Sequence, residues 1–314
     1  WQAASTLHIR PRFCQPDAKR RLTGRRWPLI PGTVHDAGGE RSSPDLPVIN
    51  MFWFGAPLSR VETLSIASFL AHGHPVDLYV YDDIGAVPAG ATLRDAARIL
   101  PQALLFRHRR TGSVAHFADW FRYKVLFEVG GIWADTDVIC LQPLVYDDPV
   151  VFAWETEQYL NSAVLGLPAG HPLAAWLAAS CEQPNKLLPY DSWRMRLRKV
   201  KRRYLQGDRR DRTRWGETGP KGLTHAARHF GLLARALPSW HFYPVAAEQW
   251  RTLFEAPRAD APLDFGASRA VHVWNNMMHT QAGFDKNARF ADDSSFERLW
   301  QRYLGTGTSS RPRL

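Results

Sequence analysis

FADWFRYKVLFEVGGIWADTDV, residues 117–138, is the stretch that decides the fold. Its first half places apolar residues at helical spacing, which predicts a helix over about 114–129 that ends at Gly130 and Gly131. Residues 132–134 then predict a short strand that leads directly into Asp135 and Asp137. The apolar stripe of the helix consists of Phe117, Phe121, Val125 and Val129.

Asp135 and Asp137 are candidate ligands of a divalent cation. In extended backbone, residues two apart project on the same side, so both carboxylates would face one ion while Thr136 points away. Their place after a strand puts them at a carboxyl end, where open α/β sheets bind ligands. An Asp-x-Asp triplet also arises by chance, and a solvated turn is the alternative for the triplet taken alone.

The segments before and after this stretch predict an α/β fold. Strand 48–54, helix 58–71 and strand 76–81 form a βαβ unit with parallel strands, because a crossover helix joins the two strands. Further strands are predicted at 150–154 and 162–167, with a helix after Pro172.

Residues 117–138 resemble the signature of the sugar transferases that contain a DXD motif. This group includes outer-chain mannosyltransferases, capsular-polysaccharide transferases, α-1,4-glycosyltransferases such as globotriaosylceramide synthase, and the glucosylating bacterial toxins. The resemblance implies a GT-A-type fold with a central mixed, mostly parallel sheet, a nucleotide-sugar donor and retention of anomeric configuration. Similar motifs are found at NMFWFG (50–55), LNSAVLG (160–166), WGETGP (215–220) and VHVWN (271–275).

Asp119 and Arg122 lie three apart and share a helix face away from the apolar stripe. The resemblance implies that Asp119 accepts hydrogen bonds from the donor sugar and that Arg122 contacts sugar or phosphate. A surface ion pair is the alternative. In the opening strand, the resemblance implies that Trp53 stacks on the nucleobase, although a core Trp is nearly as well supported.

The later motifs supply the remaining candidates. By resemblance, Asn161 lines the donor sugar, or it is an ordinary turn residue. His272 completes the metal shell or is structural, and Trp274 and Asn275 belong to the donor site, with Trp274 closing over the diphosphate. No carboxylate can be placed by sequence alone as a covalent nucleophile. Glu217 is the first to inspect, followed by Glu155 and Glu157.

The predicted reaction is transfer of a hexose or N-acetylhexosamine to a glycan or lipid-linked acceptor. Mn²⁺ or Mg²⁺ is the expected cofactor, because carboxylates beside a diphosphate commonly hold a divalent cation. Uridine diphosphate is the favoured carrier of the sugar and guanosine diphosphate mannose the second choice. The alternatives are a toxin-like enzyme that glycosylates protein side chains, and a non-catalytic basic protein that binds membranes or nucleic acid.

A basic segment carries most of the net charge of +10: eleven Lys or Arg lie between Trp193 and Arg214, against two Asp. Nucleic acid is an unlikely partner, because such binding does not explain the signature at 117–138. An apolar stripe on this segment is typical of a helix in an anionic membrane interface, or it packs on the domain. The stripe consists of Trp193, Leu197, Val200 and Tyr204.

The expected organisation is an irregular arm over 1–47, a GT-A domain over 48–304 with a basic insertion at about 184–214, and a flexible tail over 305–314. The three cysteines, Cys14, Cys140 and Cys181, fit neither a disulfide framework nor a zinc site. No apolar run is long enough to span a bilayer. A cytoplasmic protein, peripheral at the inner face of a membrane, is therefore expected.

Overall fold

The computed structural model describes residues 46–55, 57–257 and 263–305. These belong to one compact unit, 44–314. The predicted arm over 1–47 lies almost entirely outside the described residues, as do residues 306–314 of the predicted tail and Cys14. Cys140 and Cys181 are free and buried.

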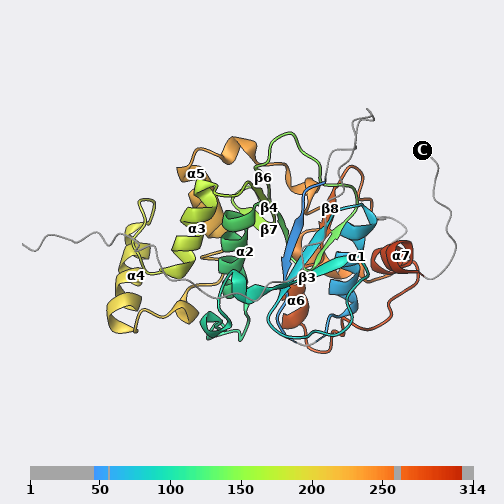
Figure 1. Ribbon diagram of the computed structural model, residues 1–314, viewed down its shortest axis with the longest axis horizontal. Helices are drawn as coiled ribbons and strands as arrows, with labels where there is room; N and C mark the ends of the chain where they lie inside the picture. The colour runs from blue at the N-terminus through green and yellow to red at the C-terminus, as the bar shows by residue number, and fades with distance from the viewer. Residues whose placement is uncertain (1–45, 56, 258–262, 306–314) are drawn as a thin grey trace, which may run out of the picture. The chain divides into compact units, whose positions relative to one another are not determined.

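A six-stranded sheet forms the centre of this unit, in the order β3-β2-β1-β4-β7-β6 (Figure 1). Strands β1, β2, β3 and β4 pair in parallel, whereas β7 runs antiparallel to both β4 and β6. The α/β fold with a mixed, mostly parallel central sheet is thus confirmed. The strands are β1 Ile49–Phe52, β2 Val76–Val80, β3 Ala91–Asp95, β4 Gly131–Ala134, β6 Val151–Trp154 and β7 Leu160–Leu167.

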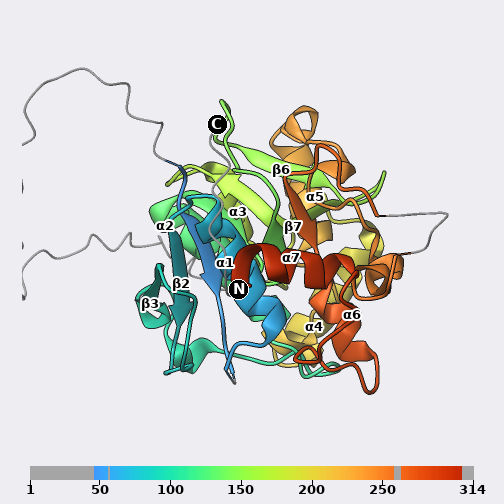
Figure 2. The ribbon, with the colours of Figure 1, turned by 90° about the vertical axis from the view of Figure 1, so that its right-hand side faces the viewer.

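Helices cover both faces of the sheet, so that two hydrophobic cores form. Figure 1 shows α2, α3 and α5 on one side and α1 and α7 on the other, and Figure 2 shows α7 lying close to α1. Among the described residues, no helix has the length and apolar character needed to span a bilayer. The helices are α1 Arg60–Ala71, α2 Ala115–Val129, α3 Pro172–Glu182, α4 Trp193–Leu205, α5 Pro220–His229, α6 Asn275–Thr280 and α7 Ser295–Leu304.

Short elements connect these layers. A second sheet pairs β5 (Val138–Cys140) with β8 (Ala270–His272) in antiparallel orientation. The 3-10 turns are Ala96–Arg98, Gln102–Leu104, Arg210–Arg212, Leu233–Arg235, Ser239–His241 and Ala247–Leu253.

The boundaries of the decisive stretch follow from its glycines. Helix α2 ends at Gly130, and the adjoining Gly131 begins β4. Both have positive φ, 71° and 91°. A Cβ on Gly131 would lie 2.8 Å from the Val48 carbonyl oxygen, so the close approach of β1 requires glycine there. The chain thereby passes from the helix into a central strand within two residues.

Candidate metal and donor site

The Asp-Thr-Asp triplet forms a turn between the two sheets, and the expectation of extended backbone through it is wrong. Strand β4 ends at Ala134, and Asp135 N donates to the Ala163 oxygen of β7 (2.8 Å). Val138 N then donates to the Asp135 oxygen (3.0 Å), which closes the turn before β5. Extended backbone would have continued into the six-stranded sheet. The turn redirects the chain, so Asp135 stays beside the large sheet while Asp137 joins the small one.

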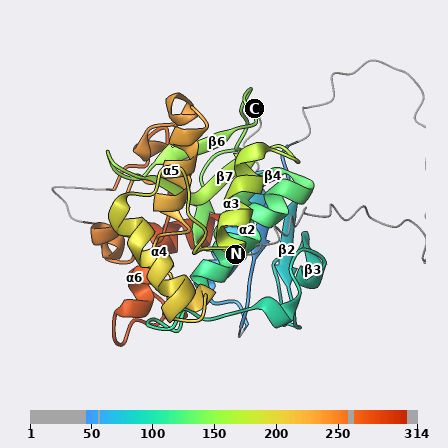
Figure 3. The same cartoon turned by 90° about the vertical axis from the view of Figure 1, so that its left-hand side faces the viewer.

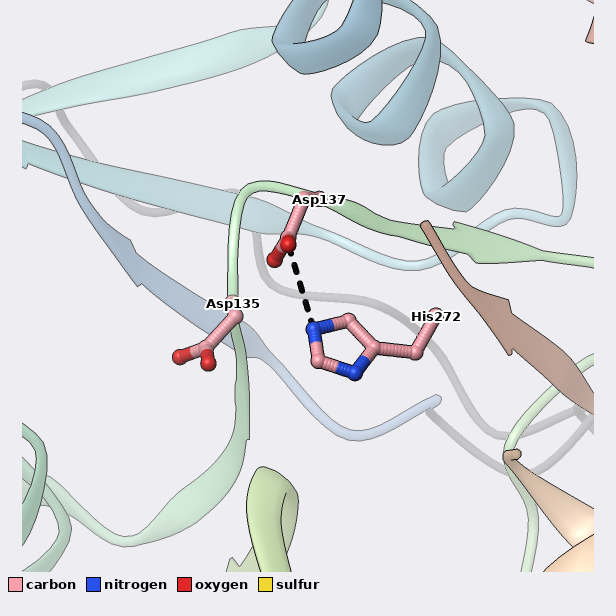
Figure 4. A group of neighbouring side chains, drawn as sticks. All are labelled: Asp135, Asp137 and His272. Carbon is pink, nitrogen blue, oxygen red and sulfur yellow. Dashed lines mark hydrogen bonds and ion pairs between the residues drawn. The ribbon is translucent and has the colours of Figure 1, made fainter. Parts of the chain in front are cut away.

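Strand β8 brings His272 to this turn from far along the sequence. In the β5–β8 ladder His272 pairs with Val138, and Val273 N donates to the Asp137 carbonyl (2.9 Å). The His272 Nε2 consequently lies 3.1 Å from Asp137 Oδ2. Figure 4 shows the two aspartates at the ends of the turn, with His272 reaching toward Asp137 from β8. One ligand atom from each of the three residues lies within 4.8 Å of the others.

The three side chains are strongly coupled electrostatically. Burial by itself lowers the pKa of His272, but Asp137 and Asp135 outweigh it and hold that pKa above its ordinary value. Burial would raise the pKa of Asp137, yet His272 and the Asn275 N–H bring it below its ordinary value. For Asp135, burial raises the pKa, Arg122 opposes this rise and the charge of Asp137 adds to it.

This donor set fits a divalent cation. Carboxylate oxygens are the preferred protein ligands of Mg²⁺ and Mn²⁺, and an imidazole nitrogen is a common ligand of transition metals. Asp137 and His272 are almost fully buried, whereas 29% of the Asp135 side chain is exposed. The cluster therefore has a rigid, buried part and an accessible part. The low exposure of Asp137 argues against a solvated turn, the alternative for the triplet taken alone.

Arg122 links the cluster to helix α2. Its Nη2 donates to Asp135 Oδ1 (2.6 Å), and its Nη1 donates to Asp119 Oδ1 (2.6 Å) and to Ser162 Oγ (2.8 Å). The second oxygen of Asp119 accepts from Thr218 Oγ1 (2.7 Å). The side chain of Arg122 is only 4% exposed, so the alternative of a surface ion pair is wrong. Asp119 and Arg122 instead belong to a buried network that ends on the DXD turn.

The segment after β8 adds a main-chain contact to the cluster. Asn275 N donates to Asp137 Oδ2 (2.6 Å). Trp274, the residue before it, has the left-handed backbone φ 62°, ψ 54°, which is uncommon for a bulky side chain and turns the Asn275 amide toward Asp137. Trp274 Nε1 donates to the Val245 oxygen (2.8 Å), and the side chain is 7% exposed. Trp274 is thereby held in a buried position, with its ring 4.2 Å from the ring of His272 between centroids.

Lys286 is a functional candidate that the sequence did not suggest. Its Nζ is hydrogen-bonded to Asn275 Oδ1 (3.1 Å), forms an ion pair with Glu62 and lies 5.5 Å from the centroid of the Trp53 ring. Its charge also contributes to lowering the pKa of Asp137. Trp53 is half-buried and follows β1. Lys286 follows α6 in a stretch without a motif, so sequence alone offered no signal for it.

Asn161 and Glu155 form a polar pair near the cluster. Asn161 Nδ2 donates to Glu155 Oε2 (2.9 Å), and Asn161 Oδ1 accepts from Ala163 N (2.8 Å). Burial raises the pKa of Glu155, and the charge of His272 partly offsets that rise. The residues after Asn161 contact the cluster and Arg122 directly, because Ser162 Oγ accepts from Arg122 and the Ala163 oxygen accepts from Asp135 N. Glu157 is exposed.

Glu217, the first carboxylate to inspect as a nucleophile, is paired with helix α4. Its carboxylate accepts two hydrogen bonds from Arg202 of α4 (2.6 and 2.9 Å) and one from Arg214 N (3.0 Å). All of these partners lie in the basic segment, and none belongs to the cluster of Asp135, Asp137 and His272. The adjoining Thr218 is the residue that reaches Asp119. Of the carboxylates considered from sequence, Glu155 therefore lies beside the cluster and Glu217 supports α4.

Two family models match the chain. Residues 68–158, which include the DXD turn, match the glycosyltransferase sugar-binding region containing the DXD motif. Residues 197–302, which include His272, match the α-1,4-glycosyltransferase conserved region. The buried network described above joins the two regions, because Asp119 and Arg122 belong to the first and Thr218 to the second.

Curated relatives carry related names. Human α-1,4-N-acetylglucosaminyltransferase is 25% identical over 203 residues, which are 58% of this chain and 51% of that protein. Human lactosylceramide 4-α-galactosyltransferase is 26% identical over 170 residues, 50% of this chain and 41% of that protein. The chain thus spans about half the length of the relatives it matches.

Among solved structures, PaToxG glycosyltransferase superimposes with a TM-score of 0.38 at 15% identity, over 60% of this chain and 70% of that one. A TM-score this low does not establish a common fold. This chain therefore carries two regions found in glycosyltransferases, the DXD sugar-binding region and the α-1,4-glycosyltransferase conserved region, and it is similar to relatives of the α-1,4 type.

Proposed function

We propose that this protein is a metal-dependent glycosyltransferase that moves a hexose or N-acetylhexosamine from a nucleotide-diphosphate sugar to a glycan or lipid-linked glycan. The observation that carries this proposal is the cluster of Asp135, Asp137 and His272, which the turn between two sheets assembles. Its position beside the end of a parallel strand is the usual place for ligands in α/β folds.

Each part of the cluster has a distinct task in this proposal. Asp135, Asp137 and His272 would hold Mn²⁺ or Mg²⁺, and the bound cation would neutralise charge on the departing diphosphate. Arg122 fixes the Asp135 carboxylate through a charge-assisted hydrogen bond, so the ligand is oriented before the donor arrives. Lys286, beside the ring of Trp53, supplies a second positive charge for the phosphates, while Trp53 stacks on the base.

The names of the relatives support the choice of substrates. An N-acetylglucosaminyltransferase and a galactosyltransferase both transfer a hexose-type sugar, and the second is named for a glycolipid acceptor. We therefore propose a uridine-diphosphate sugar as donor, with guanosine diphosphate mannose as the second choice. A lipid-linked acceptor agrees with action at the cytoplasmic face of a membrane.

We further propose that the anomeric configuration is retained and that Glu155, held by Asn161, is the carboxylate that acts near the reacting carbon. The support is its hydrogen bond to Asn161, whose chain neighbours Ser162 and Ala163 contact Arg122 and Asp135, together with burial that raises the pKa of Glu155. Glu217, by contrast, already has its charge matched by Arg202.

Thermal unfolding in the presence of candidate donors tests the proposal. A ligand that binds only the folded state raises the unfolding temperature by mass action, and its effect should require Mn²⁺ or Mg²⁺. Asp135→Asn should abolish the metal-dependent shift, whereas the control Asp292→Asn, at a side chain that is 80% exposed, should keep it. A shift that persists in excess chelator would contradict the assignment.

Turnover then separates this proposal from the alternatives. A glycan or glycolipid acceptor should accelerate release of the nucleoside diphosphate, and product stereochemistry reports retention. A toxin-like enzyme would instead label protein side chains from the same donor. A basic binding protein without catalysis would show neither product.

A further inference from the structure

Helix α4 buries charged side chains against the protein and exposes apolar ones, which is the reverse of an ordinary surface helix. Its inward side carries Lys199 and Arg202, whose side chains are 4% and 7% exposed and pair with Asp191 and Glu217. Its outward side carries the apolar stripe Trp193, Leu197, Val200 and Tyr204, which are 66%, 60%, 41% and 72% exposed. An ordinary surface helix has the opposite arrangement, with its apolar face on the core.

On the outward face of α4, the apolar residues form one narrow arc with basic residues on both sides. At about 100° per residue, the four apolar residues fall within an arc of about 60°. Four of the five exposed basic residues flank this arc: Arg194 and Lys201 lie on one flank, and Arg196 and Arg203 on the other. The fifth, Arg198, lies farther round the helix. None of the four apolar residues belongs to either hydrophobic core of the described chain.

Two buried ion pairs hold the helix in this orientation. Lys199 Nζ contacts both oxygens of Asp191 (2.9 and 3.0 Å), and Arg202 makes the two bonds to Glu217. Rolling the helix to bury its stripe would leave these charges without partners in a poorly solvated place. The exposed stripe is therefore a fixed property of the surface. Figures 1 and 3 show α4 beyond α3 and α5, on the side away from the central sheet.

We propose that the outward face of α4 is a docking surface for a bilayer that contains anionic lipid. An apolar arc flanked by Arg and Lys matches a bilayer interface, where the arc enters the acyl boundary and the flanking cations meet the headgroups. Trp and Tyr favour this depth, because their rings are amphipathic. Nucleic acid fits less well, since its phosphates would face the apolar arc and leave the stripe without an apolar partner.

The docking surface is connected to the proposed catalytic site. Arg202 of α4 binds Glu217, and the adjoining Thr218 donates to Asp119, which binds Arg122. A bilayer held against α4 therefore lies on the side of the protein from which the 215–220 segment reaches the donor network. If the proposed function is correct, a lipid-linked acceptor meets the site from that bilayer. The docking itself does not depend on the catalytic activity.

Cosedimentation of the full chain with vesicles tests the surface. We expect binding to vesicles of phosphatidylcholine with about 30% phosphatidylglycerol, and at least about 100-fold weaker binding to phosphatidylcholine alone. Replacing Trp193, Leu197 and Tyr204 with Ser should lower the partition coefficient by about tenfold or more. Replacing Arg194, Arg196, Lys201 and Arg203 with Gln should lower it by about 100-fold and remove most of its salt dependence.

Matched variants control for composition and net charge. Trp240→Ser removes an aromatic side chain that is 49% exposed elsewhere, and should bind as the unchanged protein does. Gln at Arg235, Arg289, Arg298 and Arg302 removes four exposed charges elsewhere, and should have less than about a tenth of the effect of the α4 replacement. Unfolding temperatures of all variants verify that they fold.

Three outcomes would overturn the proposal. The first is equal binding to neutral and anionic vesicles. The second is binding by the stripe variant equal to that of the unchanged protein, which would mean that charge alone is responsible. The third is duplex DNA that displaces the vesicles and binds with an affinity that depends on the α4 cations but not on the stripe, which would identify α4 as a polyanion surface. Loss of binding in the stripe variant with donor turnover retained would support docking independently of catalysis.

Discussion

The position of Glu217 leads to a prediction that separates support of the fold from catalysis. Glu217→Gln keeps the shape of the side chain and one acceptor oxygen, but it leaves the Arg202 guanidinium, 7% exposed, without a counter-charge. Breaking one side of a buried ion pair costs about 3–5 kcal/mol, and the retained acceptor reduces this to about 2–4 kcal/mol. For a chain of this size we expect the unfolding temperature to fall by about 5–10 °C.

The assay combines thermal unfolding with donor turnover measured well below the transition. Glu217→Gln should retain turnover within about threefold, because its carboxylate contacts α4 and not the metal ligands. Glu155→Gln should show the reverse: little loss of stability and a loss of turnover of about 100-fold or more. The reasoning would be refuted if Glu217→Gln kept the stability of the unchanged protein and lost turnover by about 100-fold, as expected for Glu155→Gln. Glu217 would then be the catalytic candidate.

The same pair gives a pH dependence with a definite sign. Burial opposes ionisation of Glu217, but Arg202 and the Arg214 N–H hold its pKa below the ordinary 4.5 in the folded state. The unfolded state thus binds the proton more readily, and stability from the pair is complete above about pH 4.5. It is lost as the pH falls through the lowered folded pKa. The stability difference between the unchanged protein and Glu217→Gln should therefore be constant near neutrality and shrink below pH 4.5.

The remaining predictions concern the donor site. Lys286→Met should weaken binding of the nucleoside diphosphate by about 10–100-fold, because a charge-assisted hydrogen bond contributes about 1.5–3 kcal/mol, as measured by titration calorimetry. Trp53→Ala should weaken binding of the nucleoside diphosphate if the ring stacks on the base. The fold-loss of turnover at saturating donor should not exceed the fold-loss of this affinity. Asp119→Asn should lower turnover more than affinity for the free nucleoside diphosphate, and equal loss of both would assign Asp119 to the fold. Asp137→Asn should abolish Mn²⁺-dependent binding while lowering the unfolding temperature, since this side chain accepts two hydrogen bonds in a buried position.

Local patterns in the sequence predicted the central sheet well. Helical spacing of Phe117 and Phe121 and the two glycines after Val129 located α2 and β4 to within a residue of their observed bounds. These signals are strong because they depend only on residues close together in the sequence. Burial of one helix face requires apolar residues at helical spacing, and a positive φ favours glycine. Strand β3 lacked such a signal: it lies at the edge of the sheet and four of its five residues are exposed.

The three-residue turn and the partners of each charge could not be predicted in the same way. An Asp-x-Asp triplet is compatible with a strand or a turn. The turn forms here because the residues after Asp137 pair with β8 in a second sheet. Similarly, the sequence shows eleven cations between Trp193 and Arg214 without indicating which are paired. Only the fold reveals that Lys199 and Arg202 are buried and that the apolar stripe faces outward.

The ladder between β5 and β8 determines when the cluster of Asp135, Asp137 and His272 can form during synthesis. Asp137 and His272 are separated by 135 positions, so the ribosome must release nearly the whole domain before the two can meet. Closing so long a loop is slow relative to local folding of α2 and β4. A nascent chain can therefore form much of the parallel sheet while the triad of ligands is still incomplete. If the proposed function holds and the cluster is required for it, an unfinished chain cannot consume the sugar donor.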